Sequence, residues 1–135
     1  MDLSTLSTTA ASDEGATMAL LHPTTFEPMA NDKGDPCLIK LLGRDSKKFR
    51  DNVRTKANQR LNQKKAPKKD YDDYENDGLA LLASLTVSFI NIEYNGKPAK
   101  ASDASEIYRE LPWVKEQVDE FVNDRANFIG GVLTA

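Results

Sequence analysis

The sequence predicts an α+β fold: a mostly helical single domain with a small N-terminal antiparallel β-hairpin or sheet. Two observations lead to this fold class. Apolar residues recur at helical spacing over several long segments, and two short apolar runs bounded by turn-forming residues precede them. A chain of 135 residues is long enough for one modest core and too short for two ordinary domains. We place the domain at residues 16–129.

The two ends of the chain are expected to lie outside this domain. Residues 1–15 mix Ser, Thr, Ala and Asp, and the isolated Leu3 and Leu6 bury too little apolar surface to offset the entropy lost on ordering. We therefore predict a disordered N-terminal tail whose removal leaves folding intact. Residues 130–135 begin with two glycines, which stop a helix, and are predicted to form a flexible C-terminal end.

Three short β-strands are predicted. The apolar runs at residues 17–21 and 37–42 are bounded by Pro, Gly, Asn and Asp, and they fit two strands of an antiparallel pair. The intervening loop holds Phe26 and Met29, so it can pack back on the domain or reach out. Residues 89–94 then alternate before a turn at Asn95-Gly96, which indicates a third strand pairing with the first two.

The first predicted helix follows Gly43, and either Asp45 or Ser46 can cap it. Its apolar residues form a narrow stripe, so most of this helix faces water. The stripe consists of Phe49, Val53, Ala57 and Leu61. Residues 64–69, which are rich in Lys and contain a proline, are predicted to end the helix and form an exposed linker.

Three further helices are predicted. One spans residues 71–85, a short one starts at Ser102 and runs through Tyr108, and the last spans residues 112–129. The inward residues of the first of these are Tyr71, Tyr74, Leu81, Leu82 and Leu85. The face of the last one comprises Val114, Val118, Phe121, Val122, Arg125 and Ile129. The shared spacing predicts that Leu81, Leu85, Val118, Phe121 and Val122 are buried together.

The charge is distributed unevenly along the chain. Residues 44–69 are basic, the acidic cluster of residues 70–77 follows at once, and the net charge is −3. Such a dipole can steer a charged partner or pair head-to-tail with a second copy in a homo-oligomer. A basic helix can also contact phosphates, but the overall acidity and the lack of interleaved aromatic residues favour a solvated face or an acidic protein partner over nucleic acid.

No catalytic, cofactor or metal site can be completed from these residues, so we expect a protein that is not an enzyme. The single histidine and single cysteine, His22 and Cys37, would be an isolated dyad, and a small buried thiol is the simpler interpretation of Cys37. Residues 73–78 resemble the start of a calcium loop, but Ser84 occupies the position of the closing Glu. No phosphate-binding glycine pattern is present.

The location expected for the protein is the cytoplasm, without a membrane partner. The N-terminus lacks the basic and apolar regions of a secretory signal, and no apolar run approaches the ~18 residues needed to span a bilayer.

Five residues are predicted to bind a partner. Arg50, Arg54 and Arg60 belong to the basic helix and can steer an acidic or mixed-charge protein. Trp113, the single tryptophan, and the nearby Tyr108 are of the types that dominate interface energetics. The alternative for Trp113 is that it caps the core from the start of the last helix.

The chain resembles the tail assembly chaperones of long-tailed bacteriophages over residues 16–129. Three groups of residues carry the resemblance: Leu21-His22-Pro23 with Pro28; Leu41-Leu42-Gly43-Arg44-Asp45-Ser46 before a basic helix; and Tyr108-Arg109-Glu110-Leu111-Pro112-Trp113 leading into Gln117-Val118 and Asp124-Arg125-Ala126-Asn127-Phe128. None of these motifs is catalytic.

The resemblance implies a non-enzymatic factor in the host cytoplasm that binds the tape measure protein and keeps it soluble while tail tube subunits assemble around it. The tail tube protein, and a longer form of the chaperone made by ribosomal frameshifting, are further partners that the family implies. Two alternatives stay open at this point: a structural tail or connector protein that remains in the virion, and a nucleic-acid-binding regulator.

Overall fold

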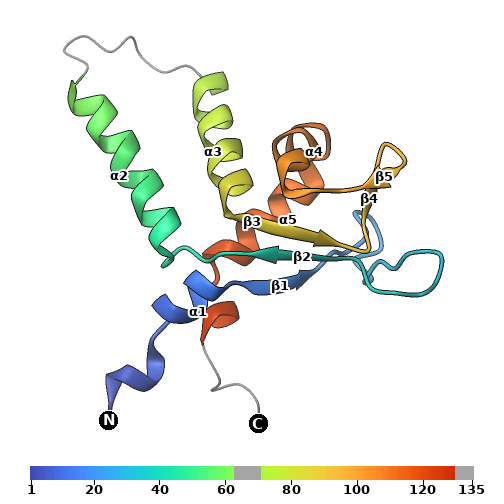
Figure 1. The fold of residues 1–135 in the computed structure, drawn as a ribbon, viewed down its shortest axis with the longest axis horizontal. Helices are drawn as coiled ribbons and strands as arrows, with labels where there is room; N and C mark the ends of the chain where they lie inside the picture. The colour runs from blue at the N-terminus through green and yellow to red at the C-terminus, as the bar shows by residue number, and fades with distance from the viewer. Residues whose placement is uncertain (63–70, 130–135) are drawn as a thin grey trace.

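A three-stranded antiparallel sheet organises the molecule (Figure 1). The computed structural model describes residues 1–62 and 71–129. In spatial order, the strands are β1 (Ala16–Ala19), β2 (Leu38–Leu41) and β3 (Thr86–Ile90). The α+β fold class and the N-terminal antiparallel pair are therefore confirmed. The third strand lies earlier than predicted, because it follows directly from the end of a helix at Leu85.

The strand register defines an inner and an outer face of the sheet. Met18, Ile39 and Phe89 pair across the three strands on the inner face. A register shift after Lys40 interrupts the pairing of β2 with β3 and leaves Val87 exposed.

A second, two-stranded sheet extends beyond β3. It consists of β4 (Glu93–Tyr94) and β5 (Lys97–Pro98). The turn between them is the one predicted at Asn95-Gly96, and these residues have φ angles of 54° and 79°. Glycine adopts a positive φ without a steric penalty and asparagine tolerates it, which is why this dipeptide favours a tight hairpin turn.

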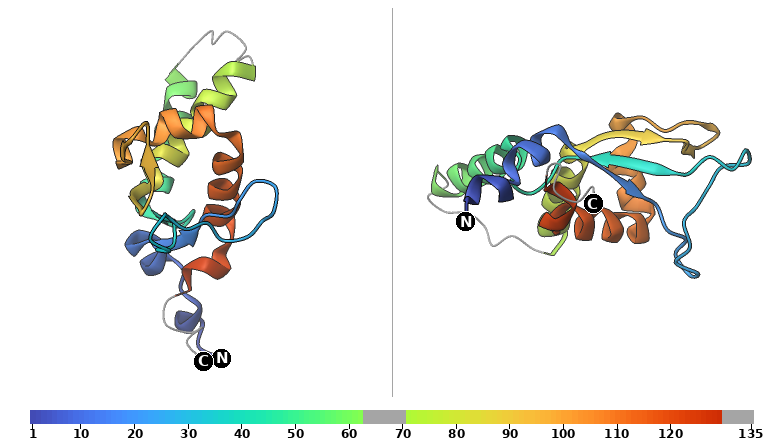
Figure 2. Two further views of the ribbon diagram at one scale, coloured as in Figure 1. Left: turned by 90° about the vertical axis from the view of Figure 1, so that its right-hand side faces the viewer. Right: turned by 90° about the horizontal axis from the view of Figure 1, so that it is seen from below.

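Two helices cover the inner face of the three-stranded sheet, as the two views of Figure 2 show. They are α4 (Ala104–Glu110) and α5 (Pro112–Asn123), and Pro112 stands at the start of α5, where its missing N–H is not needed. The core lies between them and the sheet, with Val118, Val122 and Ile39 fully buried.

Two helices, α2 (Lys47–Asn62) and α3 (Tyr71–Leu85), project from the end of the three-stranded sheet that lies away from the β4–β5 hairpin (Figure 1). Lys56 Nζ and Asp77 Oδ1 form an ion pair between the helices at 2.8 Å. Leu79, Leu82 and Leu85 of α3 are buried. The side chains of Tyr71 and Tyr74, and the predicted linker at 64–69, lie outside the described residues.

The predicted core group is only partly confirmed. Leu85, Val118 and Val122 are fully buried, whereas Leu81 and Phe121 are half-buried and pack against the margin of the core. Cys37 is buried, as expected for a lone thiol.

The prediction of a continuous last helix over residues 112–129 is wrong. The helix ends at Asn123, and Asp124 adopts an extended conformation in which its side chain accepts a hydrogen bond from Ala126 N at 3.0 Å. This local bond begins a separate 3₁₀ turn, η3 (Arg125–Phe128). The new direction of the chain buries Phe128, which packs edge-on against Phe121 with ring centroids 5.6 Å apart.

The N-terminal tail, which was predicted to be disordered, contains two helical segments in the structure. Residues 9–14 form α1 (Thr9–Glu14), preceded by the 3₁₀ turn η1 (Leu3–Leu6). Ser12 is completely buried, and Asp13 Oδ1 accepts a hydrogen bond from Lys47 N at 2.7 Å, which caps the start of α2. Leu3 and Leu6 are exposed. The C-terminal end at 130–135 lies outside the described residues.

Within the described ranges 1–62 and 71–129, no helix has both the length and the apolar character that a membrane span requires.

Candidate partner-binding sites

Two of the sequence motifs meet at Asp45, between β2 and α2. Arg125 donates hydrogen bonds to its carboxylate from Nε at 2.8 Å and from Nη2 at 3.1 Å, and Thr8 donates one from its hydroxyl at 2.5 Å. These hydrogen bonds, those of Arg125 first, lower the pKa of Asp45 from its usual 3.8 to about 2. The carboxylate thus joins the N-terminal segment to the C-terminal 3₁₀ turn.

Gly43 and Ser46 complete this junction. A Cβ atom on Gly43 would lie 2.5 Å from Ser12 Oγ and 2.9 Å from the Phe128 ring, so only glycine fits. Ser46 is buried, and its hydroxyl accepts a hydrogen bond from Phe49 N at 3.2 Å. Of the two predicted capping residues, Ser46 therefore caps α2, and Asp45 serves the junction instead.

Gln117 of α5 holds the chain that follows β1. Its side-chain oxygen accepts a hydrogen bond from Leu21 N, and its amide nitrogen donates one to Leu21 O, both at 2.9 Å. The side chain therefore pairs with the backbone much as a neighbouring strand would. Many of the residues that carry the family resemblance are thus structural.

Tyr108 was predicted to bind a partner, and the structure places it in the core instead. Its side chain is 1% exposed, and its hydroxyl shares a hydrogen bond of 2.6 Å with the Thr86 hydroxyl. Burial raises the pKa of Tyr108 to about 12. An aromatic residue on an amphipathic helix fits a core as well as an interface, and only burial distinguishes the two.

Trp113 has an intermediate position. It is half-buried and packs against the core, as the core-capping interpretation expects. Its remaining surface forms one wall of a pocket of about 760 Å³. We call this the aromatic pocket.

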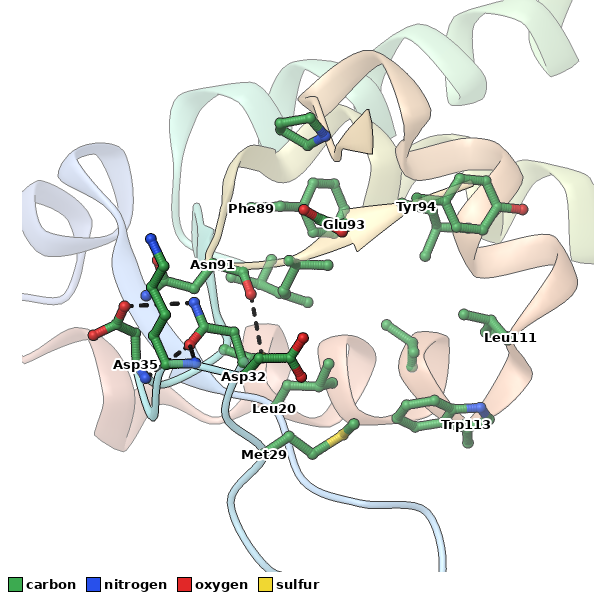
Figure 3. A pocket seen from close by; sticks show the side chains of 18 residues that line it. Leu20, Met29, Asp32, Asp35, Phe89, Asn91, Glu93, Tyr94, Leu111 and Trp113 are labelled. Atoms are coloured by element: carbon green, nitrogen blue, oxygen red, sulfur yellow. Dashed lines mark hydrogen bonds between the residues drawn. The ribbon is translucent and has the colours of Figure 1, made fainter. Parts of the chain in front are cut away.

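The aromatic pocket lies between the β1–β2 loop, the β4–β5 hairpin and the corner where α4 meets α5 (Figure 3). Its apolar walls combine aromatic, aliphatic and thioether side chains: Met29, Phe89, Tyr94, Leu111 and Trp113. The loop residue Met29 packs back toward the core, whereas Phe26 of the same loop is 70% exposed. One part of this loop therefore packs back on the domain and another part reaches out, the two possibilities that the sequence allowed.

The charged residues that line the pocket are mostly acidic. Asp32, Asp35 and Glu93 line it together with a single cation, Lys33. Figure 3 shows Glu93 beside Tyr94 on one side of the opening, and Asp32 and Asp35 at the end away from Leu111. Among the described residues, none of these three carboxylates takes part in an ion pair.

Further carboxylates lie close to the hairpin side of the pocket. Tyr94 donates a hydrogen bond from its hydroxyl to Glu110 Oε2. This bond, followed by burial and by the negative charges of Glu110, Glu106 and Asp103, raises the pKa of Tyr94 to about 12. The electrostatic environment of the Tyr94 hydroxyl is therefore negative.

The basic helix α2 lies at the other side of the molecule from the hairpin (Figure 1). Only Phe49 of its apolar stripe packs against the core, while Val53 is 51% and Leu61 81% exposed. Arg50 and Arg54 are exposed as well. The side chain of Arg60 lies outside the described residues.

The two arginines and the apolar stripe lie on one face of α2, because helical residues three, four or seven positions apart share a face. We call the residues Arg50, Val53, Arg54, Ala57 and Leu61 the α2 face. Arg54 Nη1 lies 4.0 Å from a carboxylate oxygen of the exposed Asp51.

His22 and Cys37 are engaged separately. His22 Nδ1 accepts a hydrogen bond from Thr24 N at 3.2 Å, and Cys37 Sγ donates one to Asn91 O at 3.3 Å. Burial raises the pKa of the Cys37 thiol, which disfavours the reactive thiolate. In the part of the chain that the structure describes, no three His, Cys, Asp or Glu residues are grouped to hold a metal ion.

Comparison with known proteins finds no matching family model, no matching curated protein and no matching solved structure.

Most of the aromatic pocket could not be predicted from the sequence. Met29, Tyr94 and Leu111 come from three separate segments and share no spacing that indicates a common site. The available signal was the single tryptophan beside an α-helical N-terminus, which singled out Trp113 alone.

Proposed function

We propose that this protein is a tail assembly chaperone of a long-tailed bacteriophage. It acts without catalysis in the host cytoplasm, where it binds the tape measure protein and keeps it soluble during assembly of the tail tube. The resemblance of its sequence motifs suggests this role. The structural observation that supports it best is the α2 face.

The α2 face combines exposed apolar side chains with cations. Val53 and Leu61 stand largely in water, although an apolar stripe on a helix usually has another surface to cover it. A long amphipathic helix with acidic or mixed-charge flanks fits this face, because it offers an apolar stripe to Val53 and Leu61 and carboxylates to the arginines. The same contact shields an apolar stripe of the tape measure protein from aggregation.

The two kinds of residue have different roles in this mechanism. Apolar contacts hold the complex together and control its dissociation, whereas Arg50, Arg54 and Arg60 raise the rate of encounter. Salt screens exposed charges, so high salt slows association without removing the bound state.

Co-purification with the tape measure protein tests the proposal. The complex should survive at ~0.5 M salt, where the Debye length is well below its ~10 Å value at 0.1 M. Val53→Asp combined with Leu61→Asp should release the tape measure protein. Reversal of Arg50, Arg54 and Arg60 to Glu should lower the association rate and leave the dissociation rate nearly unchanged. The control is Arg109→Glu on α4, an exposed residue away from the α2 face.

Four results would count against the chaperone. The tape measure protein could stay soluble without this protein, or the complex could be lost entirely at high salt. Mass spectrometry of purified virions could also find the protein, which would assign it to the finished tail or connector. Steeply salt-dependent affinity for DNA would favour a nucleic-acid-binding regulator.

A further inference from the structure

Most uncharged polar side chains that line the aromatic pocket are already engaged within the protein. The Asn91 side-chain amide donates a hydrogen bond to Pro36 O at 2.8 Å, and the Cys37 thiol donates one to Asn91 O. The Tyr94 hydroxyl donates one to the Glu110 carboxylate. The Asn31 side-chain oxygen accepts hydrogen bonds from two backbone N–H groups of its own loop. Because these polar groups are already engaged, an apolar occupant suits the pocket better than a polar small molecule.

Negative charge predominates among the charged side chains that line the pocket. Asp32, Asp35 and Glu93 outnumber Lys33, and no ion pair neutralises them within the described residues. Glu110 and its neighbours on α4 add to the negative potential near Tyr94. Cations placed beside an apolar anchor would therefore be attracted to this rim.

We propose that the aromatic pocket is a second docking site, which takes the apolar side chains of a cationic amphipathic helix. The helix places apolar residues at positions i and i+4 against Trp113, Met29 and Leu111, and its Lys or Arg residues face Asp32 and Glu93. The pocket volume of about 760 Å³ exceeds the needs of one side chain and suits two successive anchors.

This site differs in charge from the α2 face, and it does not depend on the function proposed for that face. The α2 face is cationic and selects acidic flanks, whereas the aromatic pocket selects basic ones. The two sites can therefore hold different partners, or two differently charged segments of one partner, at opposite sides of the molecule.

A pair of designed peptides tests the site. Both are tryptophan-free helices with the same leucine anchors at i and i+4; one carries Lys beside the anchors and the other carries Glu. Trp113 is the single tryptophan of the chain and lines the pocket, so its fluorescence reports occupancy directly. The Lys peptide should shift the emission to shorter wavelength in a saturable titration, with an affinity that falls as salt is added. The Glu peptide should bind at least tenfold more weakly.

Two variants of the full-length protein locate the binding. Asp32→Asn combined with Glu93→Gln removes two rim charges and should weaken binding of the Lys peptide about fivefold, the scale of two exposed charge pairs. Met29→Ala should weaken it about as much by removing an apolar wall. The matched control for the charge variant is Glu14→Gln with Glu75→Gln, two exposed acids on α1 and α3. Val53→Asp with Leu61→Asp should leave peptide binding unchanged, which separates this site from the α2 face.

Other outcomes would overturn the proposal. Equal binding of the two peptides would show that charge does not select the occupant. Equal weakening by the control variant and the rim variant would place the peptide elsewhere. A concentration-dependent shift of Trp113 emission without peptide, abolished by Val53→Asp with Leu61→Asp, would identify the α2 face of a second copy as the occupant.

Discussion

Substitution of Gly43 by Ala tests whether the N-terminal segment docks as the structure shows. The added Cβ would lie 2.5 Å from Ser12 Oγ and 2.9 Å from Phe128, both closer than a Cβ atom can come to another atom. Ser12 and Phe128 are fully buried, so neither can move aside into solvent. Overpacking of this kind costs about 1–3 kcal/mol of folding free energy.

The assay is thermal unfolding followed by circular dichroism. For a chain of this size, a loss of about 2 kcal/mol lowers the melting temperature by about 5–10 °C. Gly78→Ala is the matched control: a Cβ there meets nothing within 4 Å, and alanine in the helix interior should stabilise by about 0.5–1 kcal/mol. Addition of Ser12→Gly to Gly43→Ala removes the closest contact and should recover part of the loss.

An unchanged melting temperature for Gly43→Ala would refute this reasoning. It would show that α1 does not pack on Gly43. It would then favour the disordered N-terminal tail that composition alone predicts. A loss that Ser12→Gly does not relieve would instead assign the clash to Phe128.

Three further substitutions probe other contacts. Hydrogen bonds from Arg125 hold the pKa of Asp45 near 2, so the carboxylate stabilises the fold above its ordinary pKa of 3.8, and this contribution is lost as the pH falls through 2. In urea unfolding at pH 2–6, Asp45→Asn should remove that pH dependence. At pH 7 it should lower the free energy of unfolding by about 1–2 kcal/mol, after allowance for solvent screening. Phe121→Ala should cost about 2–3 kcal/mol in the same assay, less than for a fully buried Phe, because the ring is half-buried. Gln117→Ala should cost about 1–2 kcal/mol and speed hydrogen exchange at the Leu21 amide; unchanged exchange would rule out the backbone pairing.

Local sequence patterns were sufficient to predict most of the secondary structure. The helix over residues 71–85, the start of the last helix at Pro112 and the hairpin turn at Asn95-Gly96 all follow from short-range spacing and backbone preference. These features depend on residues within a few positions of one another, so one sequence contains enough information to locate them.

Two predictions from the sequence were wrong because a specific side-chain contact, and not the general pattern, determines the structure there. The apolar spacing of the last helix continues to Ile129, but Asp124 bonds to the backbone two residues on and ends it. Composition predicts disorder for residues 1–15, yet the hydroxymethyl group of Ser12 fits against Gly43 and Asp13 caps α2. Both outcomes depend on the shape and hydrogen bonding of one side chain, to which average composition is insensitive.

The α+β class, the two oppositely charged segments and the lone thiol were determined by the sequence itself, because each depends on composition or on neighbouring residues. The tertiary structure alone decided that Tyr108 belongs to the core while Trp113 borders a pocket, although both are aromatic residues close together in the chain. It also brought Met29 and Tyr94 to the same pocket from segments far apart in sequence. Such assignments depend on which surfaces the packed sheet and helices leave uncovered, and that is a property of the whole fold.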